Sequence, residues 1–253
     1  MLLRSDSLES PALICHRGLA GWAPENTLAA MREAIRRGAQ FAEVDVRRSA
    51  DGVIVLMHDE TVDRTTGGQG RVDGLTWDEI SKLDAGSHFS PVFAGEPVPT
   101  LDQVLALVAS SSITLVLEVK QPDRYPGIAL QVADVLQESN LHDRVVVVSF
   151  DHDWLNRLSD LMPTARVGYL QVHPGIPRRM SGNDVLDVHW SGVLLDPTLI
   201  RRAHRQGHQV WVWTVNDARL MRLLVWLGVD GITTDHPERY PEALHVTNLR
   251  AGY

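Results

Sequence analysis

The sequence of 253 residues has a single cysteine, Cys15, so the chain cannot form an internal disulfide bond. Cys15 and His16 are neighbours in a strand-like segment and therefore point to opposite faces, which argues against a Cys–His nucleophile pair. We interpret Cys15 as a small buried apolar residue. No apolar run reaches the roughly 18 residues of a membrane span, and the first residues lack the apolar stretch of a signal peptide. These absences predict a cytoplasmic protein with no membrane span.

An excess of positive charge is also missing. The chain has 24 lysines and arginines against 32 acidic residues, for a net charge of −8. With no basic patch, the sequence argues against nucleic acid as a partner. An anionic small-molecule substrate would have to be attracted by local charges, because the overall field repels it.

Short strand-like runs alternate with helical patterns along the whole chain. Such alternation predicts an α/β fold built from parallel β/α units. The sequence suggests nine strands, one more than a (β/α)8 barrel needs. They are residues 12–15, 41–46, 53–57, 114–117, 145–149, 166–170, 192–195, 210–215 and 231–234.

The dipeptide Asp51-Gly52 resolves the extra strand, because Asp-Gly between alternating apolar runs is a strong hairpin signal. A turn centred between these two residues pairs Asp45 with His58 and makes 53–57 an antiparallel return. Eight parallel strands remain, so we predict a single-domain (β/α)8 TIM barrel over residues 1–253.

Residues 61–99 do not fit a β/α unit, since they are rich in glycine and have only short apolar pieces. We predict a small insertion after the second strand, with little regular structure, lying over the barrel mouth. Helices on either side have clear start signals. Asn26 or Thr27 is a good N-cap for the first helix, and Thr100 with Gln103 forms a capping box for the helix after the insertion.

Three acids lie on two of the predicted strands. Glu43 and Asp45 are two residues apart and share a face, and Glu118 lies on another central strand. Acids on a buried face repel and are costly to desolvate unless a cation lies between them. Their oxygen ligands suit Mg²⁺ or Ca²⁺ better than Zn²⁺. The alternative is a structural ion-pair network with neighbouring arginines or Lys120.

Other polar groups fall at the ends of strands, where the active sites of β/α barrels lie. His16 and His58 at one rim, beside three acids, are best explained as an acid–base pair. Arg17 and Lys120 could hold an anion such as a phosphate. Trp213, near the end of its strand, is a candidate for the pocket wall. Trp211 fits the barrel core at least as well as it fits the pocket.

Eight motifs occur in order along the chain: HRG (16–18), PENT (24–27), EVDV (43–46), HD (58–59), DRTTGGQG (63–70), EVK (118–120), WTVN (213–216) and GITTDHP (231–237). With these motifs the chain resembles the glycerophosphodiester phosphodiesterase family, within the phospholipase-C-like phosphodiesterase barrels.

The resemblance implies a barrel with an insertion after its second strand and metal-dependent hydrolysis of glycerophosphodiesters to glycerol 3-phosphate and an alcohol. It implies one divalent cation, Mg²⁺ or Ca²⁺ with Mn²⁺ possible, and a role for each candidate residue. The acid–base pair is His16 and His58; the metal ligands are Glu43, Asp45 and Glu118; the phosphate contacts are Arg17 and Lys120; the pocket residue is Trp213.

Two other functions stay open at this point. A lysophospholipase D acting on lysolipids would need an apolar channel near the mouth, and no basic amphipathic helix indicates one. A non-catalytic barrel that binds phosphodiesters would not need two rim histidines. The sequence also leaves open the head group, the oligomeric state, and whether the nucleophile is water or the substrate's own 2-hydroxyl.

Overall fold

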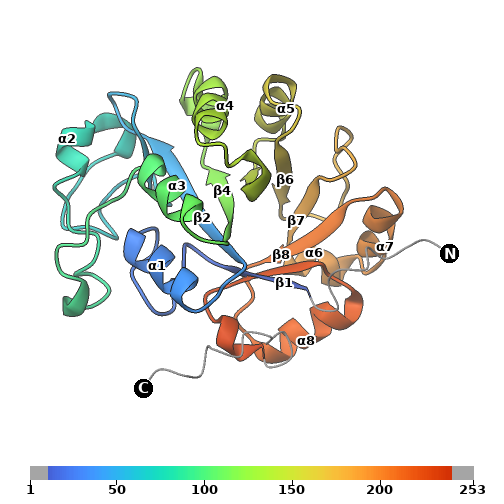
Figure 1. Ribbon diagram of the computed structural model, residues 1–253. Coiled ribbons are helices and arrows are strands. Elements are labelled where there is room, and N and C mark those ends of the chain that lie inside the picture. The colour runs from blue at the N-terminus through green and yellow to red at the C-terminus, as the bar shows by residue number, and fades with distance from the viewer. Residues whose placement is uncertain (1–10, 241–253) are drawn as a thin grey trace.

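Eight parallel strands close into a barrel in the computed structural model, which describes residues 11–240 (Figure 1). Strand β1 pairs with both β2 and β9, which completes the ring. The predicted (β/α)8 barrel is therefore confirmed. Its parallel strands are β1 (Ala12–Cys15), β2 (Phe41–Arg48), β4 (Thr114–Val119), β5 (Val145–Ser149), β6 (Arg166–Gln171), β7 (Val185–His189), β8 (Gln209–Trp213) and β9 (Gly231–Thr234).

Helices surround the strands in chain order, and α2 lies apart from them with the insertion (Figure 1). Thr27 caps the first helix through Ala30 N, and Thr100 and Gln103 form the predicted capping box. None of the helices within residues 11–240 is long and apolar enough to cross a membrane. The helices are α1 (Leu28–Arg36), α2 (Trp77–Ile80), α3 (Leu101–Ala109), α4 (Ile128–Glu138), α5 (His152–Leu161), α6 (Trp190–Leu195), α7 (Thr198–Arg205) and α8 (Ala218–Leu227).

The barrel interior is filled by side chains, as is usual for this architecture. Trp211 is 1% exposed and packs with Ile14, Val116 and Leu170, which confirms the core interpretation of this tryptophan. A Cβ at Gly231 would lie 2.6 Å from the Trp211 ring, so only glycine fits beside the indole. The mouth is therefore open only above this packed layer.

The predicted hairpin exists, but its register differs by one residue. Strand β3 (Ile54–Leu56) runs antiparallel to β2, with Val46 opposite Leu56. The main-chain N–H of Met57, rather than of His58, donates to Asp45 O at 3.0 Å. The turn has three residues instead of two, because Gly52 takes a left-handed conformation (φ +94°) and adds a bulge.

The predicted strand at 192–195 is wrong, because these residues belong to α6. The strand that pairs in the barrel is β7, a few residues earlier. A short apolar run does not distinguish a helix from a strand. Asp187 in the middle of β7 also breaks the apolar pattern by which buried strands are recognised.

The insertion has short helical turns at η1 (Val72–Gly74) and η2 (Pro91–Phe93) besides α2. Its apolar side chains, among them Val62, Val72 and Ile80, form a cluster with Val55 and Met57 of the hairpin segment. This cluster is distinct from the one that packs the outer helices against the barrel. Two further 3₁₀ turns follow β4 and α4, at η3 (Pro122–Arg124) and η4 (His142–Arg144), and a third, η5 (Pro237–Arg239), follows β9.

Candidate active site

Glu43, Asp45 and Glu118 converge at the mouth side of β2 and β4. Asp45 lies opposite Glu118 in the strand register, and Glu43 points to the same face two residues earlier. Ligand oxygens of the three carboxylates lie within 4.8 Å of one another. Burial, with smaller contributions from Asp45 and Glu118, raises the pKa of Glu43 well above its ordinary value. Burial likewise raises the pKa of Glu118 to about 7.

Asp45 behaves differently, although it is 1% exposed. Burial is the largest single influence and would raise its pKa, but Lys120, Arg17, His58 and the Asn26 hydrogen bond together lower the pKa to about 2. Asn26 fixes this carboxylate by donating from Nδ2 to Oδ2 at 2.8 Å and accepting the Asp45 N–H at 2.9 Å. Desolvation and mutual repulsion therefore raise the pKa of two of the three acids, as expected for carboxylates that share one buried site.

The donor set fits a divalent cation. Glu43 Oε1 is buried and has no hydrogen-bond partner among the described residues. Its other oxygen, Oε2, accepts the Arg17 main-chain N–H at 2.9 Å and is thereby held in place. An unpartnered oxygen beside two more carboxylates is the arrangement that hard oxygen-seeking cations such as Mg²⁺ and Ca²⁺ occupy.

Two cationic side chains lie against these acids. Lys120 Nζ is 2.7 Å from Glu118 Oε1 and 3.4 Å from Asp45 Oδ1. Arg17 Nε is 3.4 Å from Asp45 Oδ2, and Arg17 Nη1 donates to Glu25 at 2.7 Å. Both cations are therefore placed to meet an anion that approaches the carboxylates.

A left-handed turn after β1 positions Arg17. Arg17 and Gly18 have φ values of +50° and +83°, and a Cβ on Gly18 would lie 2.6 Å from Ala30 Cβ. Gly18 is thus required both for its conformation and for its close approach to α1. This explains why glycine follows the His-Arg pair.

His16 is oriented by a carboxylate from the other end of the chain. Its Nδ1 lies 2.7 Å from Asp235 Oδ1, and Asn216 holds Asp235 by donating to Oδ2 at 2.6 Å. A carboxylate at Nδ1 selects the tautomer with a proton on that nitrogen. Nε2 of His16 is then the nitrogen that can exchange a proton with a substrate.

His58 has the same arrangement, with Nδ1 2.7 Å from Asp59 Oδ1. Arg47 fixes its main chain by donating to His58 O from Nη2 at 2.8 Å. Burial is the largest influence on the His58 pKa and lowers it. Two histidines, each with a carboxylate at Nδ1, therefore flank the acidic cluster.

An aromatic wall lies across the barrel from these charges. Strand β8 is four strands from β4 in the ring, so Trp213 faces Glu118. The Trp213 ring contacts Phe150 at 5.5 Å and His189 at 5.0 Å between centroids, both edge-on. The mouth thus has a charged half that can hold a phosphodiester and an apolar half that can contact its carbon atoms.

Comparisons with known proteins agree with this geometry. The profile of the Glycerophosphoryl diester phosphodiesterase family matches residues 16–239. The chain belongs to this family. A glycerophosphodiester phosphodiesterase from Caldanaerobacter subterraneus is 37% identical over 232 residues, which are 89% of this chain and 94% of that relative. Another enzyme of that name, from Bacillus subtilis, is 32% identical over 90% of this chain and 84% of its own length.

Solved structures of the same family have the same fold. The crystal structure of a glycerophosphodiester phosphodiesterase from Agrobacterium tumefaciens is 30% identical, with a TM-score of 0.78 over 91% of this chain and 98% of that one. A phosphodiesterase from Oleispira antarctica in complex with the product sn-glycerol-3-phosphate is 28% identical, with a TM-score of 0.80 over 93% of this chain and 97% of that one.

The structure brings together all eight residues that the sequence indicated, at one end of the barrel. Five further residues at this mouth were not indicated by the sequence. Asp187 and His189 were missed because β7 was placed too late in the chain. Glu25, Asn26 and Asp235 lie within matching motifs, but the sequence indicated no role in the site for any of them. Asn26 was only a candidate N-cap, a role that Thr27 takes. Their contacts with the site join residues that are not neighbours in sequence.

Asp187 is an acid on the interior face of β7, four strands from Glu43 across the barrel. It is 3% exposed, and its Oδ1 has no hydrogen-bond partner among the described residues. Burial, with a smaller contribution from Glu118, raises its pKa to about 8. The folded protein therefore holds a neutral carboxyl where the unfolded chain has an ionised one.

Asp187→Asn is expected to stabilise the protein increasingly as the pH rises from about 4 to about 8. The unfolded acid loses its proton near its ordinary pKa of 3.8, whereas the folded acid keeps it until about 8. Within this window the wild type loses up to about 1.4 kcal/mol of stability per pH unit, and an amide does not. Urea unfolding of the metal-free wild type and of Asp187→Asn at pH 5 and pH 8 measures this effect. If the free energies of unfolding of the two proteins differed by the same amount at both pH values, the prediction would be refuted.

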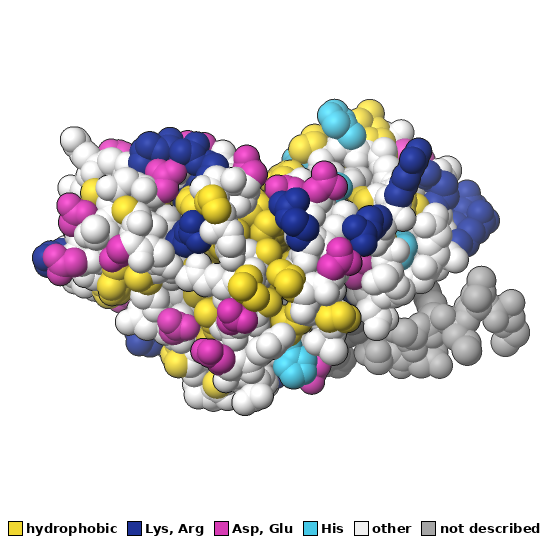
Figure 2. Space-filling model, turned by 90° about the horizontal axis from the view of Figure 1, so that it is seen from above, with side chains coloured by type: hydrophobic (Ala, Val, Ile, Leu, Met, Phe, Trp, Pro, Cys, Tyr) yellow, Lys and Arg dark blue, Asp and Glu magenta, His cyan; other side chains and the backbone are white. Residues whose placement is uncertain are grey.

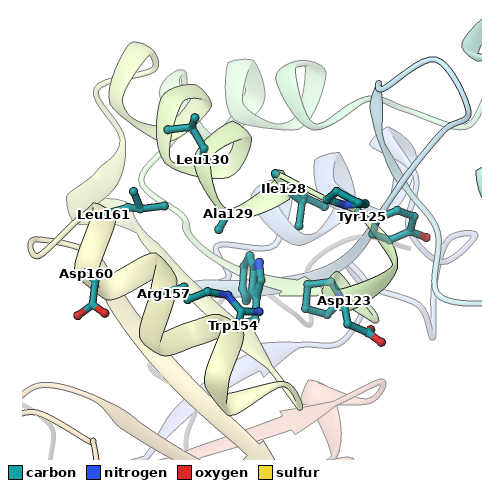
Figure 3. Close-up of a pocket in the computed structure, with 12 residues that line it drawn as sticks. Asp123, Tyr125, Ile128, Ala129, Leu130, Trp154, Arg157, Asp160 and Leu161 are labelled. Carbon is teal, nitrogen blue, oxygen red and sulfur yellow. The ribbon is translucent and has the colours of Figure 1, made fainter.

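A separate pocket of about 550 Å³ lies outside the barrel, between α4 and α5 (Figure 3). Ile128, Leu130 and Leu161 line it together with Trp154, whose Nε1 has no hydrogen-bond partner among the described residues. On the face of the molecule that is seen from above in Figure 2, hydrophobic side chains gather near the middle, with charged side chains close by. None of the eight candidate site residues lines this pocket, so it is separate from the candidate site at the mouth.

Proposed function

We propose that the chain hydrolyses glycerophosphodiesters to glycerol 3-phosphate and an alcohol, using the residues of the barrel mouth and one divalent cation. The observation that carries the proposal is the convergence of three carboxylates and two cations between two carboxylate-bound histidines. The related phosphodiesterase from Oleispira antarctica, bound to sn-glycerol-3-phosphate, supports the product.

Each group has a task that its geometry suits. A cation held by Glu43, Asp45 and Glu118 supplies Lewis-acid stabilisation of the phosphoryl oxygens when bound; Mg²⁺, Ca²⁺ and Mn²⁺ all suit this set. Arg17 and Lys120 exchange their ion pairs with these acids for contacts to the phosphodiester.

The histidines move the protons. One accepts the proton of the attacking hydroxyl as the new P–O bond forms, and the other gives a proton to the oxygen of the departing alcohol as its P–O bond breaks. Water or the 2-hydroxyl of the glycerol group can be the nucleophile, and a second hydrolysis step follows in the latter case. Trp213 packs against the carbon atoms of the glycerol group. Cytoplasmic location stays a prediction.

Turnover of glycerophosphocholine tests this function. With Mg²⁺ present, the chain is expected to release choline and glycerol 3-phosphate in equal amounts, measured by coupled assays for both products. Release of phosphocholine and glycerol would show that the opposite P–O bond breaks. Absence of any product from folded, metal-supplied protein would refute the proposal.

The insertion provides a prediction about substrate choice. Glu60, just before it, accepts from Gln121 after β4 at 2.6 Å. Asp73, within it, pairs with Arg124 of the loop after β4 at 2.8 Å. These contacts support its placement over the mouth.

Replacing residues 67–97 with a short Gly/Ser linker is expected to change the ratio of kcat/KM for glycerophosphocholine and glycerophosphoglycerol. The barrel should stay folded, because the insertion packs on the hairpin segment, in a cluster distinct from the one between the outer helices and the barrel. Circular dichroism and the two kcat/KM values measure this. A protein that no longer folds would show that the insertion is part of the barrel core.

A further inference from the structure

Arg64, in the insertion, contacts the carboxylates that orient two different site residues. Its Nε donates to Asp59 Oδ2 at 2.6 Å, and Asp59 is the partner of His58. Its Nη1 and Nη2 donate to the two oxygens of Glu25, each at 2.8 Å. Glu25 in turn accepts from Arg17 Nη1 at 2.7 Å. One guanidinium therefore lies between the acid–base histidine and the phosphate-binding arginine.

We propose that Arg64 is a positioning residue that fixes the positions of the His58 and Arg17 side chains relative to each other across the mouth. The inference rests on the proposed function, since it assigns Arg64 a role in placing two groups of that mechanism. Three chain segments meet at Arg64: the loop after β1, the end of the β3 hairpin segment, and the start of the insertion.

The chemistry of this bridge requires arginine. Two carboxylates face the same cation, and they would repel each other if it were absent. The planar guanidinium presents its donors in a fixed fork, so one edge can bind Glu25 at both oxygens while Nε binds Asp59. A lysine ammonium is a single point charge and cannot reproduce both contacts with the same geometry.

The backbone under Arg64 is fixed. Thr66 N donates to Val62 O at 3.1 Å, so the chain makes a helical turn here. Val62 and Thr65 are buried on the inner side of this turn. The side chain of Arg64 is 47% exposed, and it spans the rim with a backbone that packing holds in place.

The bridge restrains both site residues. Asp59 is held at its far oxygen and cannot turn away from Nδ1 of His58, so the histidine keeps its tautomer and ring orientation. Glu25 is held at both oxygens and keeps Nη1 of Arg17 in place, which leaves Arg17 Nε directed at Asp45. Loss of Arg64 should therefore affect proton transfer and phosphate binding together.

Three variants separate these two effects. Asp59→Asn should lower kcat about 10- to 100-fold, the effect of losing one charge-assisted hydrogen bond. The inhibition constant for inorganic phosphate should stay within about twofold of the wild-type value. Glu25→Gln should weaken phosphate inhibition about 10-fold with a smaller effect on kcat. Arg64→Met should show both changes, and Arg64→Lys should restore no more than one of them.

Arg202→Met is a matched control. Arg202 pairs with Asp196, and the exposed fractions of the two side chains, 44% and 28%, are close to the 47% and 30% of Arg64 and Asp59. This pair lies at α7 and touches none of the site residues. We expect its kcat and phosphate inhibition to stay within about twofold of wild type, as for ordinary surface substitutions.

The proposal is overturned if Arg64→Met leaves both kcat and phosphate inhibition within twofold of wild type. It is also overturned if kcat falls only in proportion to the unfolded fraction, with phosphate inhibition unchanged, because a purely structural role would act in that way. Wild-type protein that does not turn over glycerophosphocholine at all would instead refute the proposed function. Phosphate binding, measured by calorimetry on metal-loaded protein, would then still test the link between Arg64 and Arg17.

Discussion

Replacing His58 with alanine is expected to lower kcat by ~10²–10⁴-fold, the usual contribution of one general acid or base. His58 Nδ1 is held by Asp59, so its Nε2 is the nitrogen that can meet the substrate. His16→Ala should have an effect of the same size, because each histidine serves one of two coupled proton transfers. The double variant should be little worse than either single one, since residues that act as a unit are not additive.

His204→Ala is the matched control for this prediction. His204 also has a carboxylate partner at 2.7 Å, Asp230, and its side chain is 41% exposed against 34% for His58. It lies on α7, away from the mouth, and its loss should leave kcat within about twofold of wild type. Circular dichroism confirms the fold of each variant. A folded, metal-loaded His58→Ala protein within a few-fold of wild type would remove His58 from the mechanism.

Glu43→Gln is expected to abolish the response of the protein to divalent cations. In the metal-free site, burial and the neighbouring acids already raise the pKa of Glu43, so a neutral amide of the same shape should change metal-free stability little. The amide cannot supply a charged ligand, so turnover should fall by more than ~10²-fold, corresponding to several kcal/mol of lost stabilisation.

Thermal unfolding measures the same loss without an activity assay. A cation at 100 times its Kd stabilises the folded wild type by about 2.7 kcal/mol. For a protein of this size that corresponds to a rise in Tm of roughly 5–10 °C. Asp184→Asn, a change of a buried acid just before β7 and away from the mouth, should keep the rise. An undiminished Tm rise in Glu43→Gln would show that the cation binds elsewhere.

The repeating pattern of the barrel could be predicted from the sequence, because each apolar run and each helix cap is a local signal. Thr100 with Gln103 is an example. The clustering of the eight candidate residues at one end of the barrel could also be predicted, since parallel strands place their carboxyl ends at one rim. Strand β7 could not, because Asp187 interrupts it and the following helix has the more apolar run.

Contacts between distant segments could not be predicted from local patterns. Asp235 lies 219 residues after His16, and Arg64 lies 39 residues after Glu25. Nothing in the local sequence of either partner indicates the other. The hairpin register failed for a different reason: Asp-Gly suits turns of two or three residues, and the choice moves every later residue by one place.

Turnover of glycerophosphocholine by one protein sample, before and after removal of divalent cations, tests the central claim most directly. The claim is that the acidic cluster, the two cations and the two histidines form a single metal-dependent phosphodiesterase site. Dialysis against excess chelator should abolish release of glycerol 3-phosphate, and added Mg²⁺, Ca²⁺ or Mn²⁺ should restore it. Full activity in excess chelator after dialysis would contradict the account.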